Sequence, residues 1–322
     1  MCNDGLQGEE APLIQPDPGR RTPGRPVIVG EVLFDLFPDG TSILGGAPLN
    51  VAWHLQAFAL EPLLITRVGE DAEGEAIVDA MIGWGMDLAG LQTDIAAPTG
   101  RVRVEIDDGE PFFAILPDQA YDNLDRDEAL AAIRAHETSL VYHGSLIARS
   151  PASLSTVCAI RELDGLPAFV DVNLRAPWWS SSTMFSLLDG ARWVKLNRNE
   201  IALLLEVAAV GAEIDICAAV RVLQQRHRLT QVIVTKGGEG ASVRDGDVFT
   251  EGGPATPQEI VDTVGAGDAF SAVWIAGLIS GWSTEQTLAR ALDFAADVCT
   301  YQGAVTDDRS LYLRHLENWQ ET

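Results

Sequence analysis

Short apolar runs alternate with longer stretches of helical periodicity along most of this chain. The first run, at residues 27–30, is β-branched and ends in glycine, which is typical of a buried strand. The same features predict strands at residues 63–68, 140–143, 168–172, 193–196 and 231–235. Helical spacing predicts helices at residues 48–59, 73–84, 153–163, 183–188, 199–205, 214–227, 267–280 and 285–302. This alternation predicts an α/β domain with a mostly parallel sheet, helices on both faces, and ligands at the carboxyl ends of the strands.

Two segments depart from this alternation and predict hairpins. Residues 101–106 and 111–116 show partial strand alternation, and the Asp108-Gly109 step between them is a common hairpin turn. We predict that they form a small β flap outside the main sheet. A second hairpin is predicted at residues 241–244 and 247–250. Residues 1–26 combine Gly, Pro and charge, so we expect a flexible leader before a folded domain spanning residues 27–322.

The composition supports a large core and limits the partners. Apolar residues make up 47% of the 322 residues, which is enough to bury a substantial core. The formal net charge of −25 repels nucleic acid and anionic lipid, so we expect neither as a partner. Any phosphate site must then be built locally, from backbone N–H groups, helix N-termini and a bound cation. The charge can also serve solubility alone.

The cysteines and the apolar segments favour a cytoplasmic protein. Cys2, Cys158, Cys217 and Cys299 are widely spaced, with no CxxC pair and no histidine cluster, so neither a zinc site nor a disulfide framework is predicted. Reduced thiols fit a reducing cytoplasm. No apolar stretch approaches the length needed to cross a bilayer, and we expect no signal peptide at the N-terminus.

The segment DTVGAGDAF, at residues 262–270, holds the strongest candidate chemistry. Gly265, Ala266 and Gly267 leave the backbone unobstructed where an apolar helix begins, so N–H groups and the helix dipole favour a bound anion there. Asp268, in the first helical turn, can accept a proton from a hydroxyl that attacks a phosphoryl group. Such a loop can also simply allow close helix packing, with the Asp as a cap.

Two motifs together resemble the PfkB, or ribokinase-like, family of carbohydrate kinases. Residues 262–268 match the family's Asp-Thr-x-Gly-Ala-Gly-Asp signature at every fixed position, and Gly45, Gly46 and Asn50 match its N-terminal signature. In order and spacing, the resemblance runs from about residue 27 to about residue 305. It implies a ribokinase-like three-layer sandwich with a β lid, formed here by about residues 32–44 and 98–120. It also implies an ATP-dependent sugar kinase with Asp268 as the catalytic base.

Further segments resemble the family's nucleotide and metal elements. Asn197 and Glu200 match its Asn-x-x-Glu element, which implies that Asn197 helps to place the ATP phosphates and that Glu200 holds Mg²⁺ through water. A Glu just after a strand end suits a hard cation held by carboxylate and water. The same pair can form an ordinary helix cap, and the two roles are compatible. Thr235, Gly237 and Gly240 lie in a segment that resembles the family's ATP loop.

The resemblance also implies a monovalent-cation site and a dimer. A K⁺ site would use Asp262, the backbone of Val264 and the loop near Gly303, although Val264 offers no side-chain oxygen. Lid strands in this family often pair across a dimer. The apolar runs at 101–106 and 111–116 would allow a homodimer through the lid.

The acceptor residues implied by the resemblance are Asp35, Gly45, Gly46, Asn50 and Arg175. Asp35 would bind sugar hydroxyls together with Gly46 and Asn50, because carboxylates and amides make paired hydrogen bonds to vicinal hydroxyls. Without the family, a turn residue is an equal interpretation of Asp35. Arg175 stands in DVNLRAPWW, at residues 171–179. This segment resembles the Asp-x-Asn-x-Arg-x-x-Leu-Trp element of fructokinases and 2-keto-3-deoxygluconate kinases, with Trp in place of the Leu, and D-fructose is the predicted acceptor.

The lid sequence keeps other acceptors open. Fructokinases usually carry an Arg just before Ala-Asp there, and Gln119 takes roughly that place. No Lys or Arg occurs between Arg103 and Arg126, which argues against an acceptor bearing phosphate or carboxylate. Arg101, Arg103 or Arg175 would have to contact such an acceptor. 2-Keto-3-deoxygluconate, ribose, a nucleoside or an aminosugar are the alternatives.

Two other classes of protein are weighed against a kinase. A non-catalytic binding module with the same fold should have lost the Asp and the glycines of the 262–268 segment, and this chain keeps them. A Rossmann dehydrogenase should carry G-x-G-x-x-G after its first strand, and this chain does not.

Overall fold

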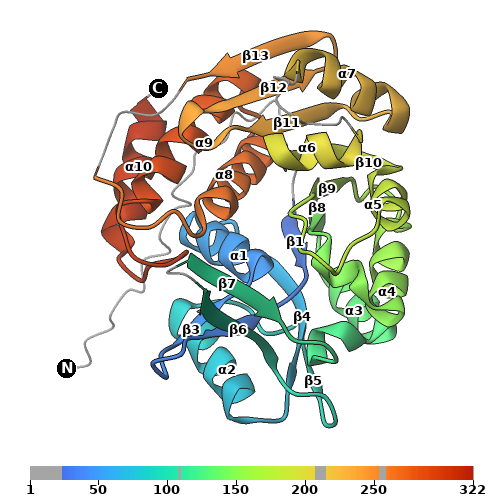
Figure 1. Ribbon diagram of the computed structural model, residues 1–322, viewed down its shortest axis with the longest axis vertical. Helices are drawn as coiled ribbons and strands as arrows, with labels where there is room; N and C mark the ends of the chain where they lie inside the picture. Colours follow the sequence, from blue (N-terminus) through green and yellow to red (C-terminus); the bar gives the residue numbers. More distant parts are fainter. Residues whose placement is uncertain (1–23, 108–109, 207–214, 254–258, 322) are drawn as a thin grey trace, which may run out of the picture.

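The computed structural model describes residues 24–107, 110–206, 215–253 and 259–321. Within them, nine strands form one sheet in the order β13-β12-β11-β10-β9-β8-β1-β4-β5 (Figure 1). In this order the strands from β11 to β5 pair in parallel, and β12 and β13 extend the sheet antiparallel at one edge. The bounds of these strands are β1 Arg25–Val29, β4 Leu63–Gly69, β5 Leu91–Asp94, β8 Thr138–His143, β9 Ala168–Asp171, β10 Ala191–Asn197, β11 Gln231–Thr235, β12 Ala241–Asp245 and β13 Val248–Gly252.

Helices cover both faces of this sheet, and a separate apolar core holds each set. The first core takes side chains from α1 Ala47–Ala57, α2 Ala72–Trp84, α8 Ala266–Ser280, α9 Thr284–Val298 and α10 Arg309–Glu321. The second takes them from α3 Arg126–Arg134, α4 Pro151–Arg161, α5 Ser181–Leu188, α6 Arg198–Leu204 and α7 Ile216–His227. Alternation along β1 shows how one sheet serves both cores, because Ile28 packs into the first core while Val27 and Val29 pack into the second.

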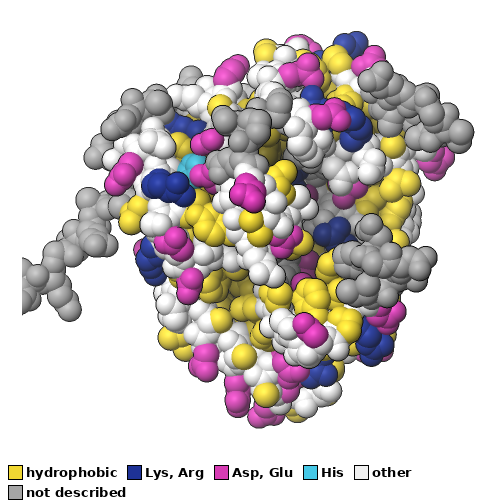
Figure 2. Space-filling view, turned by 60° about the vertical axis from the view of Figure 1, so that its left-hand side comes forward, with side chains coloured by type: hydrophobic (Ala, Val, Ile, Leu, Met, Phe, Trp, Pro, Cys, Tyr) yellow, Lys and Arg dark blue, Asp and Glu magenta, His cyan; other side chains and the backbone are white. Residues whose placement is uncertain are grey.

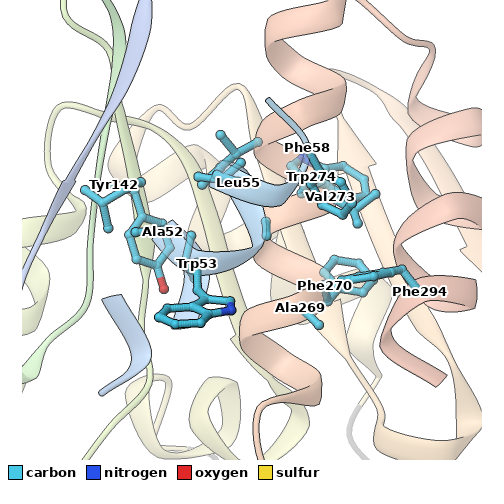
Figure 3. Close-up of a cluster of buried hydrophobic side chains, with 14 of the residues drawn as sticks. Ala52, Trp53, Leu55, Phe58, Tyr142, Ala269, Phe270, Val273, Trp274 and Phe294 are labelled. Carbon is cyan, nitrogen blue, oxygen red and sulfur yellow. The ribbon is translucent and has the colours of Figure 1, made fainter. Parts of the chain in front are cut away.

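Helix α8 runs through the middle of the first core. It is apolar on all sides, so it must be covered on all sides. Phe270 and Trp274 of α8 pack in the same cluster as Trp53 of α1, its C-cap residue Phe58, and Phe294 of α9 (Figure 3). This packing holds the N-terminus of α8 in a fixed place at the carboxyl end of the sheet.

A smaller sheet forms the predicted β lid. Within the described residues it has four strands in the order β3-β2-β6-β7, with bounds β2 Leu33–Leu36, β3 Ser42–Gly45, β6 Gly100–Asp107 and β7 Glu110–Ile115. Strands β2 and β6 pair in parallel, and the outer strands pair antiparallel to them. The predicted Asp108-Gly109 turn lies outside the described residues.

The predicted α/β sheet with helices on both faces and a small lid is confirmed, and the exceptions have local causes. Strands β3 and β5 were not predicted, because each has only four residues and, unlike the equally short but fully buried β9, shows no continuous apolar run. Helix α3 was also missed. Helix α10 was missed although Leu311, Tyr312, Leu316 and Trp319 are buried at helical spacing.

Two predicted boundaries are corrected. The helix predicted to reach residue 302 ends at Val298, and the carbonyl of Cys299 instead accepts N–H bonds from Val261 and Asp262. The predicted leader ended at Pro26, but Arg25 and Pro26 already belong to β1. Residues 1–23 of that leader, and Ile214 at the predicted start of α7, lie outside the described residues. Among the helices of the described ranges, none combines the length and apolar character that a membrane span requires.

Candidate active site

A pocket of about 560 Å³ lies where the carboxyl ends of β1, β9, β10 and β11 meet the N-terminus of α8. The lid covers it, with Val102, Phe113 and Ile115 in its lining. The predicted site residues that line it are Asp35, Gly46, Asn50, Arg175, Asn197, Glu200, Thr235, Gly265, Gly267 and Asp268. The predicted residues that do not line it are Gly45, Gly237, Gly240, Asp262 and Ala266.

The N-terminus of α8 is open to this pocket because of its glycines. Gly265 is the N-cap, with φ of 81° in the left-handed region, and it has no side chain to cap the first-turn N–H groups. A Cβ at Gly265 would lie 2.4 Å from the Cα of Ala304, so no other residue fits without a shift of the backbone. Gly267 also lines the pocket. This helix end can therefore receive an anion through its backbone.

Asp268 stands at this helix end and faces α1. Its Oδ2 accepts a hydrogen bond from Asn50 Nδ2 at 2.8 Å. Burial raises the pKa of Asp268 to about 6, against the opposing effects of the Asn50 hydrogen bond and the charge of Lys195. The side chain still lines the pocket, so it can reach a bound ligand. The group is an ionised base close to neutral pH.

A buried lysine lies beneath Asp268, and the sequence analysis assigned it no role. Lys195 Nζ donates to Asp171 Oδ2 at 2.7 Å, and the same oxygen accepts bonds from Ser271 at 2.9 Å and Tyr142 at 3.1 Å. Lys195 and Asp171 both line the pocket. A Cβ at Gly267 would lie 3.6 Å from Lys195 Nζ. The lysine thus places a positive charge at the helix end where an anion would bind.

Asn197 and Glu200 form the cap predicted as one of their two roles. Asn197 Oδ1 accepts the N–H groups of Asn199 and Glu200, both at 2.9 Å. Glu200 Oε2 in turn accepts a hydrogen bond from Asn197 N–H at 2.7 Å, and Glu200 Oε1 accepts one from Leu174 N–H at 2.8 Å. Burial raises the pKa of Glu200. Both residues also line the pocket, and a metal-binding role for Glu200 stays a prediction.

The part of the pocket beneath the lid is rich in carboxyl groups. Burial raises the pKa of Asp35 to about 6, and the Arg175 charge opposes this shift. Burial raises the pKa of Glu31 to about 7 in the same way. The sequence analysis did not select Glu31, although a Glu immediately after a buried strand, at the carboxyl end of the sheet, was a usable signal.

The arginines of the lid do not reach this part of the pocket. Arg101 forms an ion pair with Glu73 at 2.9 Å, and the Arg103 side chain is 62% exposed. Both flank Val102, which lines the pocket, so they lie on the opposite face of β6. Of the arginines considered from the sequence, Arg175 is the one that lines the pocket among the described residues.

Asp262 lies where a monovalent-cation site was predicted. Its Oδ1 accepts Val264 N–H and its Oδ2 accepts Gly303 N–H, both at 3.0 Å. The carboxylate therefore joins the two segments named in the prediction, and K⁺ binding there stays a prediction.

The protein carries far more acidic than basic side chains. On the face in Figure 2, Asp and Glu side chains are scattered widely, while Lys and Arg occur as isolated groups. This agrees with the formal net charge of −25. Binding of an anion would thus depend on the α8 N-terminus, on Lys195 and on a cation bound together with the anion.

Comparison with known proteins agrees with this architecture. The model of the pfkB family of carbohydrate kinases matches residues 31–310. A fructokinase of Klebsiella pneumoniae is 30% identical over 303 residues, which cover 88% of this chain and 95% of that protein.

Solved structures share the fold. The structure of Arabidopsis thaliana ribokinase with ribose and ATP aligns with a TM-score of 0.77 at 24% identity, over 91% of this chain and 99% of that one. Fructokinase from Vibrio cholerae, with fructose, ADP and calcium bound, aligns with a TM-score of 0.74 at 23% identity, over 89% and 97% of the two chains. These likenesses establish the ribokinase-like fold. The match of the family model to residues 31–310, most of the chain, shows that this chain belongs to the pfkB family of carbohydrate kinases.

Proposed function

We propose that this protein transfers the γ-phosphoryl group of ATP to a hydroxyl of a neutral sugar, with D-fructose as the leading acceptor. The observation that carries the proposal is the position of Asp268. It lies at the open N-terminus of α8, bonded to Asn50 at 2.8 Å, in a pocket shared by the lid and the ends of the strands. A base beside an anion-binding helix end is what phosphoryl transfer to a hydroxyl requires.

The nucleotide side is assigned from the same pocket. Thr235 and Asn197 line it next to the helix end, so the ATP phosphates would lie between them and the N–H groups of Gly265 and Gly267. Gly237 belongs to the turn Gly237–Glu239 that follows Thr235, outside the lining. We propose that this turn, together with Gly240, lies alongside the bound ATP.

We propose that Mg²⁺ binds in this pocket mainly through the ATP phosphates and water molecules. Among residues 24–107, 110–206, 215–253 and 259–321, no group of three or more His, Cys, Asp or Glu is placed to hold a metal ion. Mg²⁺ commonly binds one or two carboxylates, several waters and substrate phosphates. Glu200 lines the pocket and is the residue we propose to hold the ion through water, where the ion would screen phosphate charge.

In the proposed reaction, the chain's residues hold the sugar and move one proton. Asp35, Gly46 and Asn50 would bind sugar hydroxyls under the lid, and Arg175 would contact the sugar or the transferring phosphoryl group. Asp268 would take the proton of the attacking hydroxyl. The α8 N-terminus and Lys195 would stabilise the charge on the transferred group. The lid would exclude water, so that the sugar rather than water is phosphorylated.

A panel of acceptors tests the substrate. We expect D-fructose to show the highest kcat/KM among D-fructose, D-glucose, D-ribose, 2-keto-3-deoxygluconate, adenosine and fructose 6-phosphate. The two anionic compounds should be at least about a hundredfold poorer, because Glu31 and Asp35 repel a second anion. ADP release with ATP and Mg²⁺ is the measurement.

The outcomes of this panel separate the alternatives. Selective turnover of ribose, adenosine or 2-keto-3-deoxygluconate would keep the kinase and replace fructose. ATP binding without turnover of any sugar would favour the non-catalytic binding module. Calorimetric ATP binding serves as the control that the protein is folded and competent.

The pH profile tests the base. Because the pKa of Asp268 is raised to about 6, the ionised fraction falls as the pH drops through that value. We therefore expect kcat/KM to be constant near pH 8 and to fall about tenfold per pH unit below pH 6. Glu31 and Asp35 titrate in the same range, so the profile is also recorded for Glu31→Gln and Asp35→Asn. Retention of the acidic limb in both variants assigns it to Asp268, and a flat profile down to pH 5 would contradict the assignment.

A further inference from the structure

A buried carboxyl group at the acceptor side of the pocket has no role in the reaction described above. Glu31 is only 5% exposed, and it lines the pocket together with Asp35, Asn50 and Asp268. Its Oε2 has no hydrogen-bond partner among the described residues. Asn50 Oδ1, which lines the same pocket, is also buried without a partner there. Such acceptor atoms are normally satisfied in a folded protein, so a missing partner points to a ligand.

The residues behind Glu31 are held mainly by contacts of their own, although Arg149 Nη1 and the Tyr121 hydroxyl are, like Glu31 Oε2, buried without a partner among the described residues. Arg149 is committed to Asp122, through bonds of 2.7 and 2.6 Å, and to the carbonyl of Leu116 at 2.8 Å. Its guanidinium group lies 4.9 Å from the ring centroid of Tyr121 and 4.6 Å from that of Trp178. Stacking between two rings and a two-point ion pair hold the arginine in place.

Tyr121 is held as firmly as Arg149. A Cβ at Gly100 would lie 2.9 Å from the edge of the Tyr121 ring, so the ring packs directly against the first residue of β6. The tyrosine is fully buried. Glu31 lines the pocket on its other side, where a ligand can reach it.

The hydrogen-bonding character of this part of the pocket favours a ligand rich in donors. Glu31 Oε2 and Asn50 Oδ1 are unsatisfied acceptors, and Asp35 and Asp268 add two more carboxyl groups. Hydroxyl groups both donate and accept, whereas phosphate and carboxylate only accept at neutral pH. A polyhydroxylated, uncharged molecule is the complement of such a surface.

We propose that Glu31 is a further acceptor-binding and specificity-determining residue, whose Oε2 receives a hydrogen bond from a hydroxyl group of the sugar. This inference rests on the proposed sugar kinase function. Glu31 would select a hydroxyl at one carbon of the sugar and disfavour an acidic group at that place. Burial raises the pKa of Glu31 to about 7, and the charges of Arg175 and Arg149 oppose this shift.

The test compares sugar binding in matched variants. Binding of each sugar in the acceptor panel is measured by calorimetry with a non-hydrolysable ATP analogue, and turnover is measured separately. At pH 8, above the raised pKa of Glu31 of about 7, we expect Glu31→Gln to weaken the affinity for the best sugar by about tenfold or more, the range for a hydrogen bond to a charged group, with little change in affinity for the ATP analogue. Glu137→Gln, at an exposed position before β8, is the control and should match the wild type.

Deoxy sugars identify the hydroxyl. Removal of each hydroxyl in turn should weaken binding of the sugar to the wild type. One deoxy sugar should bind the wild type and Glu31→Gln equally, because it lacks the hydroxyl that donates a hydrogen bond to Glu31. Glu31→Asp keeps the carboxyl group but shortens the side chain by one methylene group, which moves the carboxyl away from the sugar. It should remain folded and show a reduced preference for the same hydroxyl.

Each outcome decides between the inference and the proposed function. Equal sugar affinity and equal deoxy-sugar discrimination in wild type and Glu31→Gln would overturn the role of Glu31 while leaving the kinase intact. Sugar that binds in a Glu31-dependent way but is not phosphorylated would overturn the proposed function and support the subsite. An ATP-binding protein with no affinity for any sugar would overturn both.

Discussion

Replacing Asp268 with asparagine is expected to lower kcat by about a thousandfold or more while the variant still binds ATP. Asparagine has nearly the same shape and can still accept the bond from Asn50 through its amide oxygen, so the pocket should keep its geometry. It cannot take a proton from the attacking hydroxyl. ADP release under saturating sugar gives kcat, and calorimetry gives the affinity for ATP.

A control substitution separates the loss of the base from the effect of removing any acidic residue from the first turn of a helix. Asp127 is an exposed residue in the first turn of α3, so Asp127→Asn removes the same charge from the first turn of another helix. We expect this control to retain wild-type kcat. If Asp268→Asn kept kcat within a few-fold of the wild type, Asp268 would not be the base.

The second large effect is expected at the buried ion pair beneath the base. Lys195→Met should lower the free energy of unfolding by about 3–5 kcal/mol, because it leaves the Asp171 carboxylate buried without its counter-charge. The two side chains are only 7% and 2% exposed, and their atoms lie 2.7 Å apart. Ser271 and Tyr142 would still donate to Asp171, but they carry no charge. Equilibrium unfolding in urea measures the change.

Two further variants test the cause. Lys236 is the chain's other lysine, and its partner Glu251 is 61% exposed, so Lys236→Met should cost less than about 1 kcal/mol. Combining Lys195→Met with Asp171→Asn removes both charges and should recover part of the lost stability. A loss for Lys195→Met as small as that of Lys236→Met would show that the pair contributes little.

Local patterns were sufficient for most of the helices, the buried strands and the segment that carries Asp268. Gly265 shows why, since a left-handed N-cap in close contact with Ala304 requires glycine, and that requirement is visible in the sequence as a glycine-rich helix start. The end of the helix predicted to reach residue 302 was not visible in this way. It depends on Cys299 accepting bonds from residues about forty positions away in the chain, which no local window contains.

The same distinction separates the site residues that were predicted from those that were missed. Asn197 and Glu200 were selected because they match a short motif of the family, and the cap that they form was predictable as well because its members are neighbours in sequence. The contact between Lys195 and Asp171 was not predicted, because it follows from the register of β10 against β9, where these two residues are paired. Register is set by packing across the whole sheet.

By itself, the sequence determined the class of fold, the order of most of its elements and the motifs that identify a carbohydrate kinase, because periodicity and glycine placement are local properties. Only the tertiary structure decided which acids share the pocket, and it alone showed that Glu31 is buried in the same pocket as Asp35, with its Oε2 unpartnered among the described residues. It also showed that Arg149 pairs with Asp122, which lies 27 positions away in the chain. Burial and the pKa shifts that follow from it depend on atoms brought together from distant segments, and no local pattern encodes them.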